Sequence, residues 1–167
     1  MKETVNPLLS VVIPCYNSGY YIRECLESLR AAKSARVEYI LIDGGSTDNT
    51  MTIVEEYREI FSVVISEKDK GQSDAFNKGF ALAQGEYLTW LNSDDVFCSG
   101  SLEFSLDWIE KDKKPWYAAN LLYFDKDSRI TRCCQSRGFE TWALRFGVLN
   151  VFGPSTIFSR KLFQDLG

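Results

Sequence analysis

Apolar runs typical of β-strands alternate with amphipathic helical repeats through the first 95 residues of the chain. Four short runs rich in Val, Ile, Leu and aromatic residues lie at 10–14, 38–42, 63–66 and 86–91. Between them, apolar residues recur at helical spacing, as at Ile22, Cys25, Leu26 and Leu29. Strands alternating with helices form right-handed βαβ units, so the pattern predicts a parallel sheet flanked by helices.

Beyond residue 95 the pattern is mixed. A helix is predicted at 101–109, a strand at 116–124 with a hairpin partner at 129–134, a helix at 141–149, a strand at 156–158 and a last helix over 159–166. The chain has no repeats, linkers or low-complexity tracts. We therefore expect residues 1–167 to form one mixed α/β domain.

Polar loops follow each of the first four predicted strands. They lie at 15–19, 43–48, 67–71 and 92–95 and are rich in Asp, Asn, Ser and Gly. Loops at the carboxyl ends of parallel strands gather along one edge of the sheet, where ligands bind in open α/β folds. The sequence therefore predicts a cleft of nucleotide size at this edge.

Two adjacent carboxylates, Asp94 and Asp95, come directly after the fourth apolar run. Like charges this close repel, so both remain ionised only beside a compensating positive charge. A divalent cation, Mg²⁺ or Mn²⁺, supplies such a charge and commonly bridges to phosphates of a substrate. The alternative is a helix cap with a solvated turn, since Asp favours both positions.

Composition excludes several classes of function. The net charge of −4 and the pI near 5.0 argue against binding to nucleic acid or to anionic membranes. No apolar run reaches the roughly 20 residues of a membrane span, and residues 1–9 lack the features of a signal peptide, so we expect a cytoplasmic protein. The absence of histidine from the chain excludes His-based triads and His-ligated metals.

Several motifs, taken together, resemble a known family. They are Ser-Val-Val-Ile-Pro-Cys-Tyr-Asn at 10–17, Ile-Asp-Gly-Gly-Ser-Thr-Asp at 42–48, Lys-Gly-Gln-Ser-Asp-Ala-Phe-Asn-Lys-Gly at 70–79, Asn-Ser-Asp-Asp at 92–95, and the segment from Gly-Pro-Ser-Thr at 153–156 to Phe-Gln-Asp-Leu-Gly at 163–167. In this order and spacing they resemble the family 2 inverting glycosyltransferases of the GT-A fold. The resemblance implies a Rossmann-like, mostly parallel sheet, with a nucleotide-sugar-binding half at 1–97 and a mixed acceptor-side half at 98–167.

The resemblance also implies a set of site residues. Those expected to bind a nucleoside diphosphate sugar, most simply a UDP-sugar, are Pro14, Tyr16, Asn17, Asp43, Asp69, Lys70, Gln72, Asn92 and Ser93. Within that set, Asp43 is expected to accept a hydrogen bond from a uracil N–H. Asp94 is expected to be the main ligand of Mn²⁺ or Mg²⁺, and Asp95 a supporting or alternative ligand.

The chain departs from the family pattern at two places. Asn92 stands where many members have the leading Asp of an Asp-x-Asp motif, which should weaken metal affinity without abolishing it. The family's catalytic carboxylate follows the Leu-Gly that closes the acceptor segment, and here that Gly is residue 167. We therefore expect the base beyond Gly167 and a catalytic domain truncated at its C-terminus.

These observations predict a metal-dependent, inverting transferase that moves a sugar to the hydroxyl of a glycan or lipid-linked acceptor in polysaccharide synthesis. The protein would act in the cytoplasm or at the inner face of the membrane, and homodimer formation is left open. The alternative is a nucleotide-sugar-binding module without transfer activity. A dehydrogenase is disfavoured because residues 15–19 hold a single glycine and no Gly-x-Gly-x-x-Gly. A nucleotidyltransferase is disfavoured because no glycine-rich basic loop follows the first strand.

Overall fold

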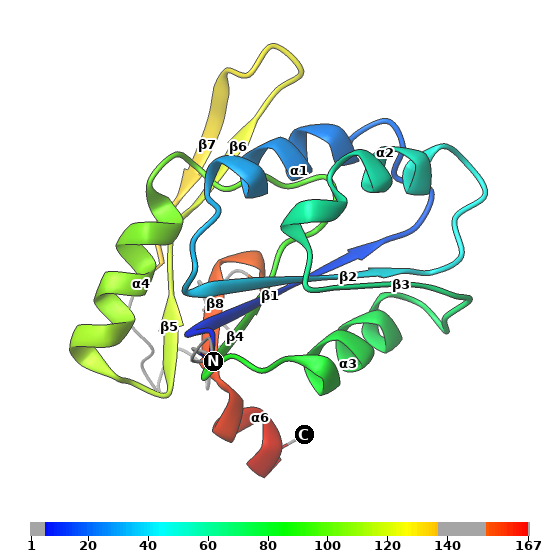
Figure 1. The fold of residues 1–167 in the computed structure, drawn as a ribbon. Helices are drawn as coiled ribbons and strands as arrows, with labels where there is room; N and C mark the ends of the chain where they lie inside the picture. The colour runs from blue at the N-terminus through cyan, green and yellow to red at the C-terminus, as the bar shows by residue number, and fades with distance from the viewer. Residues whose placement is uncertain (1–5, 137–152, 167) are drawn as a thin grey trace, which may run out of the picture.

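The computed structural model describes residues 6–136 and 153–166, which form an α/β fold with a central, mostly parallel sheet (Figure 1). The strands are β1 (Leu9–Cys15), β2 (Val37–Asp43), β3 (Val63–Ser66), β4 (Tyr87–Trp90), β5 (Trp116–Ala118), β6 (Leu121–Phe124), β7 (Ile130–Cys134) and β8 (Thr156–Ser159). The α-helices are α1 (Ile22–Ala31), α2 (Thr50–Glu56), α3 (Gln72–Leu82), α4 (Ser101–Asp112) and α6 (Arg160–Leu166). Short 3₁₀ turns lie at Arg58–Ile60 and Gly153–Ser155.

Within the described residues the main sheet has six strands in the order β3-β2-β1-β4-β8-β5. The first four are parallel, with Leu9 of β1 opposite Val37 of β2 and Tyr87 of β4, which confirms the prediction from the alternating pattern. β8 runs antiparallel to both β4 and β5 and lies between them. Every carboxyl end of the parallel strands therefore points to the same edge.

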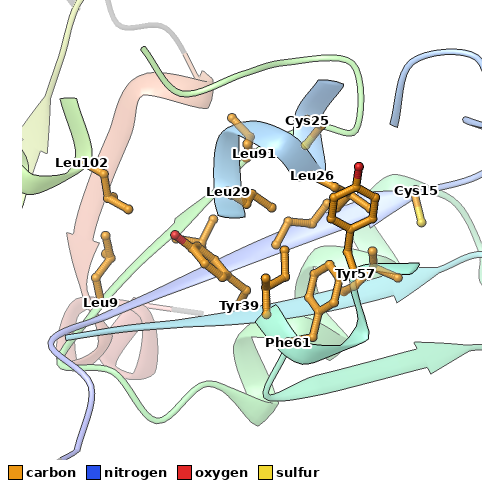
Figure 2. Close-up of a cluster of buried hydrophobic side chains, with 14 of the residues drawn as sticks. Leu9, Cys15, Cys25, Leu26, Leu29, Tyr39, Tyr57, Phe61, Leu91 and Leu102 are labelled. Atoms are coloured by element: carbon orange, nitrogen blue, oxygen red, sulfur yellow. The ribbon is translucent and has the colours of Figure 1, made fainter. Parts of the chain in front are cut away.

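Helices cover both faces of this sheet. Figure 1 places α1 and α2 on one face and α3 on the other. The larger core joins the first face to α4, and Figure 2 shows Leu29 of α1 near Tyr39 of the sheet and Leu9 of the sheet directed toward Leu102 of α4. The second core packs α3 and the aromatic rings of β8 and α6 against the opposite face. Burial of large apolar side chains on both faces is typical of parallel sheets.

Glycine sets the spacing between α3 and the sheet. A Cβ on Gly79 of α3 would lie 2.3 Å from Val12 Cγ1 of β1, closer than atoms in contact can approach. The missing side chain lets the helix backbone approach the strand directly. The position of α3 matters for function because its first turn lies at the edge where the polar loops gather.

A buried carboxylate joins three segments at the opposite end of the parallel strands. Glu38 of β2 is 8% exposed, and its Oε1 accepts hydrogen bonds from Ser10 Oγ at 2.5 Å, Gln84 N at 2.5 Å and Gly85 N at 3.1 Å. Gly85 N also donates to Ser10 Oγ at 2.8 Å. A Cβ on Gly85 would lie 2.6 Å from both Ser10 N and Ser10 Oγ, so the turn before β4 passes close to β1.

The predicted strand at 116–124 is wrong as a single element, because the structure divides it into β5 and β6. β5 pairs with β8 in the main sheet, whereas β6 pairs with β7 in a separate hairpin that projects from the body of the protein (Figure 1). The break falls at Ala119, whose N–H donates to Ser155 O at 2.8 Å, and at Asn120, whose Oδ1 accepts from Ser136 N at 3.0 Å. These bonds to distant residues turn the chain between the two sheets.

The hairpin partner predicted at 129–134 is confirmed as β7, and the final strand and helix as β8 and α6. The helix predicted at 141–149 lies outside the described residues. None of the helices in residues 6–136 and 153–166 is long and apolar enough to cross a membrane.

Candidate functional site: a cleft at the carboxyl edge of the sheet

The loops that follow β1, β2, β3 and β4 surround one cleft of about 910 Å³. Its lining residues are Pro14, Cys15, Tyr16, Asn17, Ser18, Tyr21, Gly44, Gly45, Thr47, Lys68, Asp69, Gly71, Gln72, Ala75, Asn92, Ser93 and Asp94. All four loops contribute, so the predicted convergence is confirmed. Of the residues expected to bind donor or metal, eight line the cleft, and Asp43, Lys70 and Asp95 do not.

The first and second loops are held together by reciprocal hydrogen bonds. Asn17, in a left-handed conformation with φ 48°, donates its N–H to Ser46 Oγ at 2.8 Å. Its side-chain Oδ1 accepts from Thr47 N at 2.9 Å. Asn tolerates this conformation better than most residues. Asn17 therefore has a structural role in the loop, in addition to its predicted contact with the nucleoside.

Asp48 fixes the start of α2 against the first loop. Its Oδ1 accepts from Thr50 Oγ1 at 2.5 Å and Thr50 N at 3.0 Å, and its Oδ2 accepts from Gly19 N at 2.9 Å. The hydrogen bonds from Thr50, with that from Gly19, lower the pKa of Asp48 below its ordinary value. Asp48 is therefore a charged anchor for two loops that border the cleft.

Asp43 lies beneath the cleft, at the end of β2, with no exposed surface. Its Oδ2 accepts from Ser66 Oγ at 2.6 Å, Ser46 N at 3.1 Å and Gly45 N at 3.2 Å, and its Oδ1 accepts from the Ser46 hydroxyl. The carboxylate thereby organises the second loop and ties it to β3. Its predicted hydrogen bond to a uracil ring stays a prediction.

Two glycines of the second loop lie against the third loop. A Cβ on Gly44 would lie 2.8 Å from Asp69 Oδ2, and one on Gly45, where φ is +84°, would lie 3.3 Å from Lys68 Cγ. Asp69 also accepts from Gly71 N at 2.9 Å, which fixes its carboxylate at the cleft. This end of the cleft thus combines a carboxylate with the ammonium group of Lys68, a residue that sequence reasoning missed in favour of Lys70.

The fourth loop presents its two carboxylates differently. Asp94 is exposed at the cleft and makes no hydrogen bond with the described residues. Asp95 is half-buried, and its Oδ2 accepts from Asn92 Nδ2 at 2.8 Å. Burial raises the pKa of Asp95, the charge of Asp94 acts in the same direction, and the hydrogen bond from Asn92 opposes both.

Hydroxyl and aromatic groups complete the wall near β1. Ser18 Oγ lies 2.8 Å from Ser93 Oγ, which joins the first loop to the fourth. Tyr16 and Tyr21 line the cleft with 63% and 56% of their surface exposed, so they present aromatic faces to a ligand. Cys15 also lines it, but burial raises the pKa of its thiol, which stays protonated and unreactive at neutral pH.

The parallel sheet, its helices and a polar cleft at the carboxyl edge define an α/β domain of the GT-A type. Residues 10–167 match the sequence profile described as Glycosyl transferase family 2. The chain therefore belongs to this family, as its motifs indicated.

Relatives and solved structures agree with this assignment. The glycosyltransferase GlyG of Streptococcus pneumoniae is 31% identical over 125 residues, which cover 73% of this chain and 42% of GlyG. S. aureus TarS residues 1–349 superpose with a TM-score of 0.73 at 25% identity, over 94% of this chain and 48% of that 1–349 chain. TarS has also been solved with UDP-GlcNAc.

A third similar protein is the mannosyltransferase PcManGT of Pyrobaculum calidifontis, solved with GDP-Man and Mn²⁺. Its TM-score is 0.69 at 18% identity, over 98% of this chain and 48% of that chain, so the likeness is one of fold. This chain spans less than half the length of GlyG, TarS and PcManGT.

Proposed function

We propose that this chain binds a UDP-sugar and transfers the sugar, with inversion, to the hydroxyl of a glycan or lipid-linked acceptor. The observation that carries the proposal is the convergence of four strand-end loops on one cleft lined by Asp94, an exposed carboxylate that makes no hydrogen bond or ion pair with the described residues. Membership of Glycosyl transferase family 2 and the UDP-GlcNAc complex of TarS support the choice of donor. A cleft of about 910 Å³ is large enough for a nucleoside diphosphate sugar.

The two ends of the cleft differ in the chemistry they offer. Near β2 and β3, Asp69 can accept from a base N–H, and Lys68 can donate to a carbonyl or phosphate oxygen. The ring of Tyr16 can pack on the flat face of the base. Near β4, Asp94 and the amide of Gln72 face the part of the cleft assigned to the diphosphate and sugar. The donor would therefore lie across the ends of the parallel strands.

The fourth loop fits a divalent cation that is bound together with a diphosphate. No group of three or more Asp, Glu, Cys or His side chains capable of holding a metal occurs among residues 6–136 and 153–166. Mg²⁺ and Mn²⁺ are commonly held by one or two carboxylates, with phosphate oxygens and water as the other ligands, and Asp94 can be such a carboxylate. When bound, the cation would neutralise charge that develops on the diphosphate leaving group.

The chain's own residues would bind and orient the donor. Tyr16, Lys68 and Asp69 would fix the nucleoside end, and the bonded pair Ser18–Ser93 would hold the first and fourth loops at a constant separation. Such fixed geometry favours direct displacement at the sugar carbon. The position of the catalytic base after residue 167 stays a prediction from the family resemblance.

Calorimetry with UDP, with and without Mn²⁺, tests the proposal. We expect Mn²⁺-dependent binding that Asp94→Asn weakens at least tenfold, because the substitution removes the charge and keeps the shape. Asp127→Asn is the matched control, because Asp127 is exposed in the β6–β7 turn, away from the cleft, and its substitution should leave binding unchanged.

Each result has a direct interpretation. UDP binding that is indifferent to Asp94→Asn would contradict the cation site, and preference for GDP or dTDP would contradict the donor assignment. A radiolabelled donor with simple hydroxyl acceptors then tests transfer. Tight binding without turnover on any acceptor would favour the alternative of a nucleotide-sugar-binding module.

A further inference from the structure

One lysine of α3 is connected to both ends of the third loop, residues 67–71. Lys78 Nζ lies 2.8 Å from Glu67 Oε1, at the start of this loop, and 3.4 Å from Asp74 Oδ2, one turn earlier in α3. Asp74 Oδ2 in turn accepts a hydrogen bond from Lys70 N at 3.2 Å, near the end of the loop. Lys78 therefore holds the loop at two points through two carboxylates.

These contacts are partly shielded from water. The side chain of Lys78 is 26% exposed and that of Asp74 is 32% exposed. The hydrogen bond from Lys70 N lowers the pKa of Asp74, and Lys78 acts in the same direction. The hydrogen bond to Glu67 raises the pKa of Lys78, so Lys78 and Asp74 both stay charged at neutral pH.

The third loop carries two charged groups of the cleft. Lys68 and Asp69 line the cleft, and both lie between the anchored residues Glu67 and Lys70. Lys78 itself does not line the cleft. Any effect of Lys78 on a ligand therefore passes through the position of this loop.

Packing supports the loop on one side only. Lys68 and Asp69 lie against the glycines of the second loop, but a Cβ on Gly71 would meet no atom within 4 Å. The strand before the loop, β3, is at the edge of the main sheet among the described residues, and its side chains are half-buried or exposed. The ion pairs of Lys78 supply the connection on the side of α3.

We propose that Lys78 is a positioning residue that fixes the third loop, and with it Lys68 and Asp69, so that the site can discriminate between the bases of nucleotide donors. The inference rests on the proposed function and deepens it. Hydrogen-bond discrimination depends on donors and acceptors that are held in place before the ligand binds. Lys78 contributes to this order without touching the ligand.

Amide hydrogen exchange tests the order of the loop without any ligand. Lys78→Met should speed exchange in the peptide that spans residues 67–71 by about threefold to fivefold, because two partly exposed ion pairs are lost. Lys78→Arg keeps the charge and the reach, and should stay within about twofold of the wild type. Glu67→Gln leaves α3 unchanged and should speed exchange in the same peptide.

Lys161→Met is the matched control for Lys78→Met. Lys161 Nζ lies 2.7 Å from Asp165 Oδ2, four residues later in α6, and neither residue lines the cleft. The substitution removes an ion pair of the same spacing on another helix. It should leave exchange in residues 67–71 and the binding of nucleotides unchanged.

A comparison of UDP with CDP tests the functional part. Uracil has a ring N–H from which the carboxylate of Asp69 can accept, whereas the corresponding nitrogen of cytosine is itself an acceptor. Because a site built for a ligand N–H rejects an analogue that lacks it, the wild type should bind UDP at least tenfold more tightly than CDP in calorimetry with Mn²⁺. Lys78→Met should weaken UDP binding about fivefold and CDP binding less than twofold, and Lys78→Arg should restore the preference.

Two results would overturn the inference alone. One is exchange in residues 67–71 that Lys78→Met leaves unchanged. The other is a Lys78→Met variant that retains the preference of the wild type for UDP, or that loses UDP and CDP binding equally, since a general loss of structure weakens both. A wild type that does not prefer UDP contradicts the donor assignment itself, and with it the discrimination that the inference assigns to the loop.

Discussion

The Glu38 cluster offers a quantitative test of how the first half of the sheet is held together. Replacing Glu38 with Ala removes the carboxylate oxygen that accepts hydrogen bonds from Ser10 Oγ, Gln84 N and Gly85 N. The site is buried, because Glu38 is only 8% exposed. Gly85 N keeps its second acceptor, Ser10 Oγ, at 2.8 Å. Two donors therefore lose their partner, the buried hydroxyl of Ser10 and the part-buried N–H of Gln84. At about 1–3 kcal/mol for each unsatisfied donor, we expect the free energy of unfolding to fall by about 2–6 kcal/mol.

Glu38→Gln separates the acceptor from its charge. The amide retains an oxygen in the place of Oε1, so each hydrogen bond changes from a charge-assisted bond to a neutral one. We expect this variant to lose about 1–2 kcal/mol of unfolding free energy, less than Glu38→Ala. Glu86→Ala is the control, because Glu86 is an exposed carboxylate beside the same turn and should change stability by less than about 0.5 kcal/mol.

Urea denaturation followed by far-ultraviolet circular dichroism measures all three variants on one scale. The reasoning is refuted if Glu38→Ala lies within about 1 kcal/mol of the wild type, since water would then satisfy the donors at little cost. Equal losses in Glu38→Ala and Glu38→Gln would show that charge, and not the retained acceptor, determines the effect.

Three further predictions follow from the helix contact and the loops. Gly79→Ala should lower the unfolding free energy by about 1–2 kcal/mol, because the cost of overpacking exceeds the gain in helix propensity. In urea denaturation, adding Val12→Ala to Gly79→Ala should restore part of this loss, because it removes the side chain that the new Cβ would meet. Losses that simply add would contradict the contact. Because folding lowers the pKa of Asp48, its stabilising contribution is present above the ordinary pKa of about 3.9 and is lost as the pH falls through the folded value. Urea midpoints between pH 7 and pH 3 should therefore fall more steeply for the wild type than for Asp48→Asn, and parallel curves would refute the assignment. Lys68→Ala should weaken UDP binding in calorimetry by about fivefold through loss of a charge-assisted contact, whereas Lys126→Ala, in the β6–β7 turn, should not.

The parallel sheet and the edge of the sheet at which the cleft lies could both be predicted from the sequence alone. Both depend on the alternation of period-2 and period-3.6 patterns, which is local, and on the rule that βαβ units place strand ends together. For this reason the sequence alone assigns the loops after β1, β2, β3 and β4 to one cleft.

The sequence did not determine which side chain of each loop faces the cleft. Lys68 and Lys70 flank Asp69 and cannot be distinguished by residue type, but of the two only Lys68 lines the cleft. Asp94 and Asp95 were separated by the hydrogen bond from Asn92. Such differences depend on loop dihedral angles and on partners distant in sequence, which periodicity does not encode.

The same limit explains the strand that was predicted at 116–124. All of its residues except Asn120 are apolar or aromatic, so the pattern favours one long strand. The structure ends β5 at Ala118 because β8, which lies almost 40 residues further along the chain, offers only a short partner. The break is therefore set by a long-range pairing.

The position of β8 between β4 and β5 has a consequence for protein synthesis. Among the described residues β5 pairs with the main sheet only through β8, so residues 116–118 have no strand partner until residues 156–159 have left the ribosome. At roughly 5–20 residues per second this interval lasts about 2–8 s. The four parallel strands and the cleft at their carboxyl ends can assemble during that time, while the aromatic segment at β5 stays exposed to chaperones. The order of strands in the sheet thus makes the cleft side of the molecule the older one in every newly made chain.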